Sequence, residues 1–437
     1  MIGIHFPSLS EYDPFKGAEG TLDPLGLYNI ADRLAIRLIP GIRERMSHPR
    51  FLTAMAVGSI LAQNFDEDYL AADGQSEPYL VYEWHLVEGI IRSRGSDPNL
   101  TGLPGTLKSK SCLHDGISLS AARYLKTPTV FGFHGVYRLL ANNLDVIRDG
   151  ILGDNGAELL YIWEKEQGLP GFLSNTEGQG LKRRQQLESA LKDGMAKGAV
   201  ARSGSWEGWS FFGNHIFHNE VPESEREFLK RLLISANEPS RKQVLEFLAS
   251  SQGQSVFNQN KSEKEFHAAL SKGVDTDTDL LLETIDVYEQ FARLLQDAFD
   301  DCLVAMTDKR GKINPKELSA LPSCQDAYKK ISGLFENVSD KLEQFNQLDI
   351  FHTSFGALDD KVPPDEWITL LLSHHVRIQR QKPPNGKNPW FEQFDDGSVV
   401  IRTAYRRSKG GKHDGSYVHA YRTNSLQSFA KDLGMVA

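Results

Sequence analysis

The sequence predicts a mainly α-helical, multi-domain protein with small β-hairpins, in which winged helix-turn-helix-like units are joined by a helical hairpin. Apolar residues recur at helical spacing along the chain, two segments follow a heptad pattern, and Asp-Gly turn signals accompany short apolar runs. The 437 residues suffice for about two to four domains. We expect an N-terminal helical domain (1–100), a winged-helix-like unit (101–173), a linker with short helices (174–262), a heptad helical hairpin (263–350) and a basic C-terminal helix-plus-hairpin unit (351–437).

The N-terminal segment predicts three helices after an extended lead-in over residues 1–24. The first helix spans residues 27–38 and ends before Pro40-Gly41. Small apolar residues within 43–65 predict a tightly packed interior helix, and a third helix is expected over 79–93.

Residues 103–167 predict the element order of a winged helix-turn-helix. A helix ends before Gly116, a short helix is expected over 119–125, a third helix contains Tyr137, and a hairpin around residues 151–152 precedes a final helix. In such a unit the third helix usually enters the major groove and the wing contacts the DNA backbone. The alternative is a unit of the same shape that serves only packing or protein contact.

The charge of this segment agrees with contact to DNA. Between residues 103 and 138, five cations outnumber the single acid Asp115. The candidate contact residues are Lys108, Lys110, Arg123, Lys126 and Arg138.

Residues 174–262 predict little regular structure. A loop or linker is expected over 174–220, with a basic helix start at 182–184. Short helices follow over 224–234 and 239–249, and the polar residues 250–262 are expected to be flexible.

The strongest periodicity lies in the heptad hairpin. Its first helix carries Leu281, Ile285, Tyr288, Ala292, Leu295, Phe299, Cys302 and Met306, and its second carries Ile331, Phe335, Val338, Leu342 and Phe345. Both sets alternate steps of four and three. Two such helices joined by a moderate loop should pack antiparallel within one chain. The alternative is a seam that forms a homodimer.

The C-terminal unit begins with a helix opened by the prolines at 363–364. A hairpin with an Asp-Gly turn is expected over 391–403, a strand over 417–422 and a final helix over 426–433. The basic loop Ser408–His413 lies between the hairpin and the strand, as a wing would.

Positive charge is concentrated in residues 374–437, where eleven Lys and Arg residues face five acids in a chain of net charge −9. Such a block is the electrostatic footprint of a polyanion partner, and a solvated basic face is the alternative. Its candidate contact residues are Arg377, Arg380, Lys387, Arg402, Arg406, Arg407, Lys409, Lys412 and Arg422. Trp390 either stacks on an exposed base or fills the local core.

Motifs for catalysis are missing from the sequence. It lacks a P-loop, a Gly-x-Ser-x-Gly elbow, a His-Glu-x-x-His helix and a cofactor glycine fingerprint, so we expect no cofactor and a binding protein rather than an enzyme. Glu83, His85 and Glu88 share a predicted helix, but without a second cluster they favour interior hydrogen bonds over a metal site. Asp395 and Asp396 match a metal-nuclease hairpin only in part, because the next strand lacks an acid-x-Lys.

Three scattered cysteines, Cys112, Cys302 and Cys324, fit a reducing cytoplasm and predict buried, inert thiols. The longest apolar stretches fall short of the roughly 20 residues that a membrane span requires, and the N-terminus lacks the pattern of a signal peptide. We therefore expect a cytoplasmic protein without a membrane partner.

Three stretches, Gly17–Tyr28, Pro40–Arg45 and His374–Phe391, resemble segments of uncharacterised bacterial proteins encoded in antiviral-defence gene neighbourhoods. The resemblance covers about the first 60 and the last 70 residues. It implies a role in defence and assigns no site residue.

The sequence thus favours a non-enzymatic DNA-binding accessory subunit that contacts duplex phosphates through basic winged-helix-like units. The first alternative is an adaptor that binds a helicase, nuclease or methyltransferase partner in a multi-subunit complex. The second is a metal-dependent nuclease.

Overall fold

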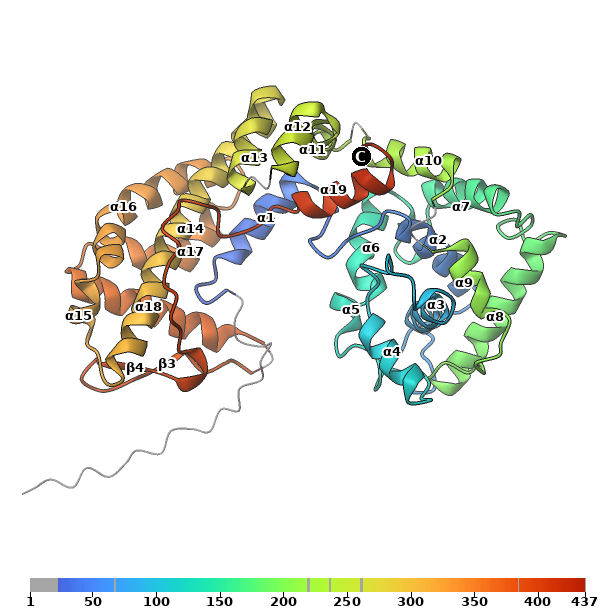
Figure 1. Ribbon diagram of the computed structural model, residues 1–437, viewed down its shortest axis with the longest axis horizontal. Helices are drawn as coiled ribbons and strands as arrows, with labels where there is room; N and C mark the ends of the chain where they lie inside the picture. Colours follow the sequence, from blue (N-terminus) through green and yellow to red (C-terminus); the bar gives the residue numbers. More distant parts are fainter. Residues whose placement is uncertain are drawn as a thin grey trace, which may run out of the picture. The chain divides into compact units, whose positions relative to one another are not determined.

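The computed structural model describes residues 23–66, 68–217, 221–235, 237–259, 262–383 and 385–436. The fold is mainly helical, with two small antiparallel two-stranded sheets, as the sequence predicts (Figure 1). Residues 1–22 lie outside the described residues. They include most of the lead-in expected over residues 1–24 and the start of the stretch Gly17–Tyr28. None of the described helices has the length and apolarity needed to cross a bilayer.

Two compact units contain the five segments expected from the sequence. Unit 1 consists of the described residues within 23–34, 262–271 and 275–420, and unit 2 of those within 35–259, 272–274 and 421–436. The first helix, α1 (Tyr28–Leu38), has residues in both units and matches the helix predicted over 27–38.

Unit 2 holds the helices of the N-terminal half and the last helix of the chain. Its elements are α2 (Phe51–Ala62), α3 (Pro78–Arg94), α4 (Thr106–His114), α5 (Pro128–Phe131), α6 (Phe133–Asn143), β1 (Ile147–Arg148), β2 (Ile151–Leu152), α7 (Asp154–Glu166), α8 (Gln179–Lys197), α9 (Trp209–His215), α10 (Glu223–Leu233), α11 (Pro239–Ala249), α12 (Ser251–Asn258) and α19 (Thr423–Asp432).

The centre of unit 2 is α2. All its residues from Phe51 to Leu61 are buried, and it packs against α3, α6, α7 and α8. A helix that is apolar on every face is stable only inside a protein, so the interior helix expected within 43–65 is confirmed. It starts later than the beginning of that stretch, because residues 43–50 form turns.

The segment predicted as a winged unit keeps part of its element order. The hairpin β1–β2 turns at Asp149-Gly150, whose φ values of 50° and 89° fit a two-residue turn of the primed type. The helix expected over 119–125 is wrong, since these residues form turns. The carbonyl of Leu119 accepts a hydrogen bond from the N–H of Val200 at 2.9 Å, and this pairing holds the backbone out of a helix.

Residues 174–262 are more helical than predicted. The 19-residue helix α8 lies where a loop or linker was expected, and its buried face includes Leu187 and Leu191. Helix α12 occupies most of the segment expected to be flexible over 250–262, of which residues 260 and 261 lie outside the described residues. The hydroxyl of Ser250 caps α12 by accepting from the N–H of Gly253 at 3.1 Å. The two short helices predicted on either side of Pro239 are confirmed as α10 and α11.

Unit 1 holds the heptad helices and most of the C-terminal unit. Its elements are α13 (Glu263–Leu270), α14 (Thr276–Lys309), α15 (Pro315–Ser319), α16 (Pro322–Glu343), α17 (Leu348–Phe355), α18 (Pro364–Gln381), β3 (Phe391–Gln393), β4 (Val399–Ile401) and the short 3₁₀ turns η2 (Gly356–Asp359) and η3 (Thr403–Tyr405). Another 3₁₀ turn, η1 (Ser271–Gly273), follows α13 and has residues in both units.

The two heptad helices pack against each other within the chain, as predicted (Figure 1). Every heptad residue predicted on α14 is buried, and so are the first four predicted on the second helix. The fifth, Phe345, lies in a turn beyond the end of α16 and is half-buried. The thiol sulfurs of Cys302 and Cys324 lie 3.5 Å apart between the two helices. The seam is therefore used inside unit 1, rather than left open for a homodimer.

The C-terminal hairpin is anchored to the loop that joins the heptad helices. Strands β3 and β4 form the predicted hairpin, with Gln393 opposite Val399, and Val399 also exchanges two backbone hydrogen bonds with Ile313 at 2.9 and 3.0 Å. The strand predicted over 417–422 is wrong, because this segment is irregular. Side chains of α14, rather than a neighbouring strand, bind its backbone. The final helix, α19, is confirmed.

Candidate nucleic-acid interface

The five cations predicted between residues 103 and 138 all lie at the surface of unit 2. Two are on α4, two are on the irregular segment after it, and one is on α6: Lys108, Lys110, Arg123, Lys126 and Arg138. Within the described part of the chain, Lys110 is the one among them whose side chain has a hydrogen-bond partner, the carbonyl of Gly95 at 3.1 Å. The acid Asp115 contacts His114 instead, at 3.0 Å. The segment therefore presents its positive charge to solvent.

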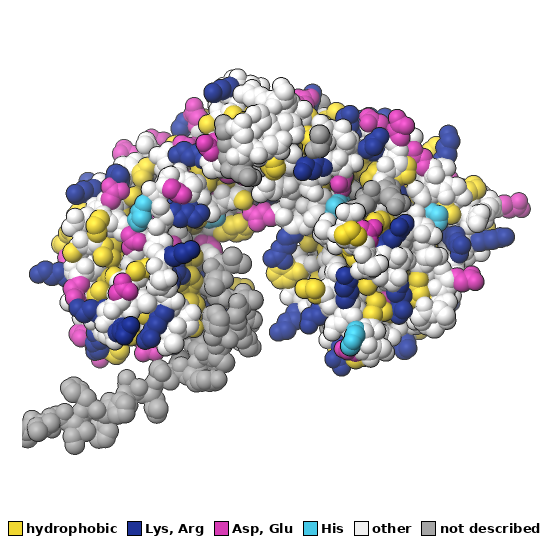
Figure 2. All heavy atoms as spheres, viewed as in Figure 1, with side chains coloured by type: hydrophobic (Ala, Val, Ile, Leu, Met, Phe, Trp, Pro, Cys, Tyr) yellow, Lys and Arg dark blue, Asp and Glu magenta, His cyan; other side chains and the backbone are white. Residues whose placement is uncertain are grey.

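Large apolar side chains are exposed on the same elements. Leu107 on α4 is 85% exposed, and Val130, Phe131 and Leu139 on α5 and α6 are each about two-fifths exposed. Figure 2 shows dark-blue cations beside yellow apolar side chains over this part of unit 2. We call these five cations and four apolar residues the α4–α6 patch. Exposed apolar residues that gather with cations indicate a binding surface.

A buried carboxylate fixes the N-terminus of α6. Glu83 on α3 is 1% exposed and accepts hydrogen bonds from the backbone N–H groups of Phe133 and His134 at 2.7 and 3.0 Å. It also accepts from the hydroxyl of Tyr124 at 2.7 Å. The first N–H groups of a helix have no partner within the helix, so an acceptor there stabilises it. Glu83 thus holds the elements that carry Arg123 and Arg138.

Burial raises the pKa of the Glu83 carboxyl to about 7, although the hydrogen bonds from His134, Tyr124 and Phe133 lower it. The interior network expected for this helix is confirmed, but its three polar residues do not act together. His85 contacts the carbonyl of Val81 at 2.8 Å, and Glu88 pairs with Arg92 at 2.8 Å. Within the described residues, no cluster of His, Cys, Asp and Glu is placed to hold a metal.

Unit 1 contains eight of the nine candidate contacts predicted near the C-terminus. Five are exposed and three are half-buried: Arg377, Arg380, Arg406, Lys409 and Lys412, then Lys387, Arg402 and Arg407. Both half-buried arginines are paired with acids, Arg402 with Glu392 at 3.7 Å and Arg407 with Asp300 at 2.6 Å. The predicted basic surface is therefore partly neutralised within its own unit.

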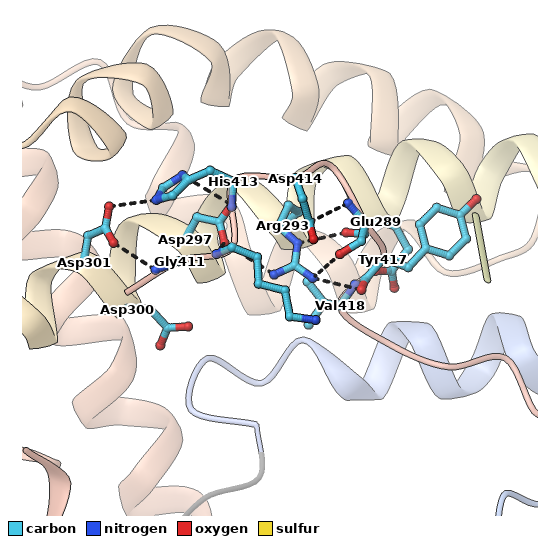
Figure 3. Close-up of polar contacts among 12 residues, drawn as sticks. Glu289, Arg293, Asp297, Asp300, Asp301, Gly411, His413, Asp414, Tyr417 and Val418 are labelled. Carbon is cyan, nitrogen blue, oxygen red and sulfur yellow. Dashed lines mark hydrogen bonds and ion pairs between the residues drawn. The ribbon is translucent and has the colours of Figure 1, made fainter. Parts of the chain in front are cut away.

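Acidic residues of α14 bind the basic loop Ser408–His413 (Figure 3). Asp297 accepts from the N–H groups of Lys412 and His413 at 3.0 and 3.1 Å, and Asp301 accepts from the N–H of Gly411 at 2.9 Å. The imidazole of His413 contacts Asp301 at 3.0 Å. A loop expected to reach a phosphate instead binds carboxylates of its own unit with its backbone N–H groups.

The same helix binds the segment that follows the loop. Arg293 donates to the carbonyl oxygens of Ser416 and Tyr417 at 2.8 and 2.9 Å, while Glu289 accepts from the N–H groups of Val418 and His419 (Figure 3). These hydrogen bonds pair the backbone N–H and C=O groups of the segment, which lies in no β-sheet. They hold the segment along α14.

Two other predicted positions are buried. Arg422 lies in unit 2, is 5% exposed and donates to the carbonyl of Ile42, so its guanidinium points into the protein rather than toward a ligand. Trp390 is 2% exposed and stacks on Tyr405 at a ring distance of 5.0 Å. It therefore fills the local core and is not available to a base.

The paired histidines of α18 are also structural. His374 contacts the carbonyl of Leu25 at 2.7 Å, and His375 contacts that of Pro24 at 2.9 Å. Burial lowers the pKa of His374 to about 4 and that of His375 to about 3. Both rings therefore stay neutral near pH 7.

Asp395 and Asp396 form the turn of the β3–β4 hairpin and are exposed. Asp396 accepts from the N–H of Ser398 at 3.0 Å, and Lys312 lies 3.8 Å from its carboxylate. This geometry stabilises a turn. The two carboxylates do not converge with further acids in the described residues.

Reasoning from the sequence missed the acids that face the basic loop. The pattern Asp297, Asp300, Asp301 places three carboxylates on one side of a helix whose other side is the heptad seam. That spacing predicts an acidic helix surface, to which the basic loop could bind. The exposure of Leu107 and Phe131, in contrast, has no signal in the sequence, since both fit a buried helix face equally well.

No protein-family model, curated protein or solved structure matches this chain.

Proposed function

We propose that the chain is a non-enzymatic DNA-binding accessory subunit of a bacterial defence or DNA-processing complex, and that it contacts duplex phosphates through the α4–α6 patch. One observation carries the proposal: five exposed cations gather on three adjoining segments of unit 2 with a single acid among them. Phosphate contacts of this kind supply most of the affinity of non-specific DNA binding. The defence context comes from the sequence resemblance alone.

In the finer form of this proposal, α6 enters the major groove and the β1–β2 hairpin contacts the backbone, as in a winged unit. Arg138 is exposed on α6, and Arg148 is exposed in the hairpin that follows it, where it pairs with Asp145 at 2.9 Å and with Asp154 at 3.3 Å. The short helix α5 directly precedes α6, with Lys126 just before it. These features support a winged arrangement even though residues 119–125 form turns.

Unit 1 makes a second, weaker contribution in this proposal. Four of its candidate contacts are exposed and have neither an ion pair nor a side-chain hydrogen bond within the described residues: Arg380, Arg406, Lys409 and Lys412. The guanidinium of Arg377 donates instead to the carbonyl oxygens of Thr353 and Ser354. Since acids of α14 lie beside the loop that carries Lys409 and Lys412, a phosphate approaching that loop meets both signs of charge. We leave Arg422 out of the surface because it is buried.

Charge reversal in the α4–α6 patch tests the proposal. The triple variant Arg123→Glu, Lys126→Glu and Arg138→Glu should bind a duplex of about 30 base pairs at least tenfold more weakly at ~50 mM salt, because each reversal removes a phosphate contact and adds repulsion. Fluorescence anisotropy of the labelled duplex gives the dissociation constant.

The matched control reverses three exposed lysines of α8, Lys182, Lys192 and Lys197, which gives the same change in net charge elsewhere in unit 2. This control variant should bind the duplex less than threefold more weakly than the wild type. Equal losses in both variants would show that net charge, and not the α4–α6 patch, governs binding.

A protein adaptor is the second candidate, and the exposed apolar side chains of the patch favour it. Leu107, Val130, Phe131 and Leu139 offer apolar area that phosphates do not use. The adaptor function replaces DNA binding if two results are found together. The full-length protein shows no salt-sensitive binding to a duplex, and it binds a purified helicase, nuclease or methyltransferase subunit in a complex that Phe131→Asp abolishes. No observation favours a metal-dependent nuclease.

A further inference from the structure

A solvent-facing groove of about 620 Å³ in unit 1 lies between α14 and α16. Its sides are residues 290–297 of α14 and 323–334 of α16, and Lys264 of α13 and residues 413–415 border it. Ligand sites commonly have volumes of about 300–1,000 Å³. The groove is thus large enough for a molecule of several tens of atoms.

The groove carries an excess of positive charge. It is lined by four cations, Lys264, Arg293, Lys329 and Lys330, and by two acids, Asp297 and Asp326. Both acids are already paired, since Lys330 contacts Asp326 at 2.8 Å and Arg293 contacts Asp297 at 3.4 Å. Lys264 is paired as well, with Asp286 of α14 at 3.6 Å. Lys329 is exposed and makes no ion pair with any described residue. An anion would therefore find a charge that the protein leaves unneutralised.

Other lining groups suit the apolar part of a ligand. Leu294 and Leu334 are half-buried in the groove, and a Cβ added at Gly333 would meet no atom within 4 Å, so open space lies above α16 there.

We propose that this groove binds a nucleotide. The phosphates lie against Lys329, Lys330 and Lys264, and the base lies over the apolar side chains of Leu294 and Leu334. Lysine is a common phosphate ligand because its ammonium is a compact charge on a flexible stem. The proposal is independent of DNA binding by unit 2, since none of these residues belongs to the α4–α6 patch.

Calorimetric titration of the full-length chain with ATP at low salt tests the site. ATP should bind saturably with one site per chain. The double variant Lys329→Glu and Lys330→Glu should weaken binding at least tenfold, while Lys316→Glu, an exposed lysine on α15 outside the groove, should change it less than twofold.

A second variant keeps every charge. Gly333→Leu would fill the open space and favour the helix, so the fold should be retained and ATP binding lost. Inorganic triphosphate and adenosine distinguish the parts of the ligand, and each should bind at least tenfold more weakly than ATP.

Four outcomes would overturn the proposal. ATP does not bind, it binds the double variant as tightly as the wild type, triphosphate matches ATP, or Gly333→Leu leaves the affinity unchanged. Loss of ATP binding in the triple variant of the α4–α6 patch would instead place the nucleotide on unit 2. Duplex binding and ATP binding are both measured on that variant, so the two proposals can fail independently of each other.

Discussion

Glu83 shows how one side chain can organise a surface that it does not touch. Its carboxylate is buried on α3, yet it binds the first two N–H groups of α6 and the hydroxyl of Tyr124. Removing such an acceptor leaves several buried donors without a partner, at a cost of about 1–3 kcal/mol each. The position of Arg138 on α6 therefore depends on an acid in the core of unit 2.

The raised pKa of Glu83 makes the stability of unit 2 depend on pH. Its folded value of about 7 exceeds the ordinary value of 4.5, so the folded state binds the proton more tightly than the unfolded state. The resulting stability is complete below pH ~4.5 and is lost as the pH rises through about 7. Relative to Glu83→Gln, which carries no titrating group, the wild type should lose on the order of 2–3 kcal/mol between pH 5 and pH 8.

Urea unfolding of both proteins at pH 5, 6, 7 and 8 measures this difference. Glu207→Gln, a change at an exposed carboxyl, serves as the control and should track the wild type at every pH. Parallel curves for the wild type and Glu83→Gln would show that Glu83 does not titrate in this range.

At the scale of elements, α14 makes two different sets of contacts. Its heptad side packs on α16, and its acidic side binds the loop and the segment from residue 410 to 419. The close approach of that loop depends on glycine, because a Cβ added at Gly411 would lie 2.7 Å from both the Cα and the Cβ of Asp297. A backbone atom of a long helix cannot move away to make room.

Gly411→Ala should therefore detach this segment from α14 and destabilise unit 1 by about 1–3 kcal/mol. Hydrogen exchange of the N–H groups at 411–413 and 418–419 should accelerate, which mass spectrometry of the full chain can measure. The control is Gly356→Ala, at a helical position where an added Cβ meets nothing within 4 Å. It should be neutral or stabilising by up to about 1 kcal/mol. Unchanged exchange in Gly411→Ala would contradict the packing of the loop.

At the scale of the whole molecule, the C-terminal basic block is not one surface. Most of its candidate contacts lie in unit 1, Arg422 is buried in unit 2, and the α4–α6 patch is in unit 2. If DNA binds mainly through the α4–α6 patch, the salt dependence of binding should report that patch.

Five phosphate contacts predict a slope of about −4 to −5 for the logarithm of the binding constant against that of salt concentration. Neutralising Arg123 and Arg138 as glutamines should reduce the slope by about 2. Neutralising Arg406 and Lys409 in unit 1 should reduce it by less than 1. Anisotropy titrations at four salt concentrations measure all three slopes, and the reverse order would move the main contact to unit 1.

Much of the fold could be predicted because local signals and tertiary packing agree. The heptads of α14 and α16, the proline start of α18 and the Asp-Gly turn before β2 all stand in the structure as expected. Predictions failed where the backbone takes its hydrogen-bond partners from residues far away in the sequence. Leu119 and Ser120 pair with the backbone at Ala199 and Val200, and residues 417–419 bind Glu289 and Arg293. No periodicity reports such partners.

For the candidate site, the sequence by itself determined that the chain is mainly helical and which segments carry excess positive charge. These properties depend on residue type and spacing. Only the tertiary structure decided which cations face solvent. The basic loop Ser408–His413 lies against carboxylates of α14, Arg422 is buried, and the cations of α4 to α6 are exposed. Charge is a property of the sequence, but its availability depends on which opposite charges the fold places beside it.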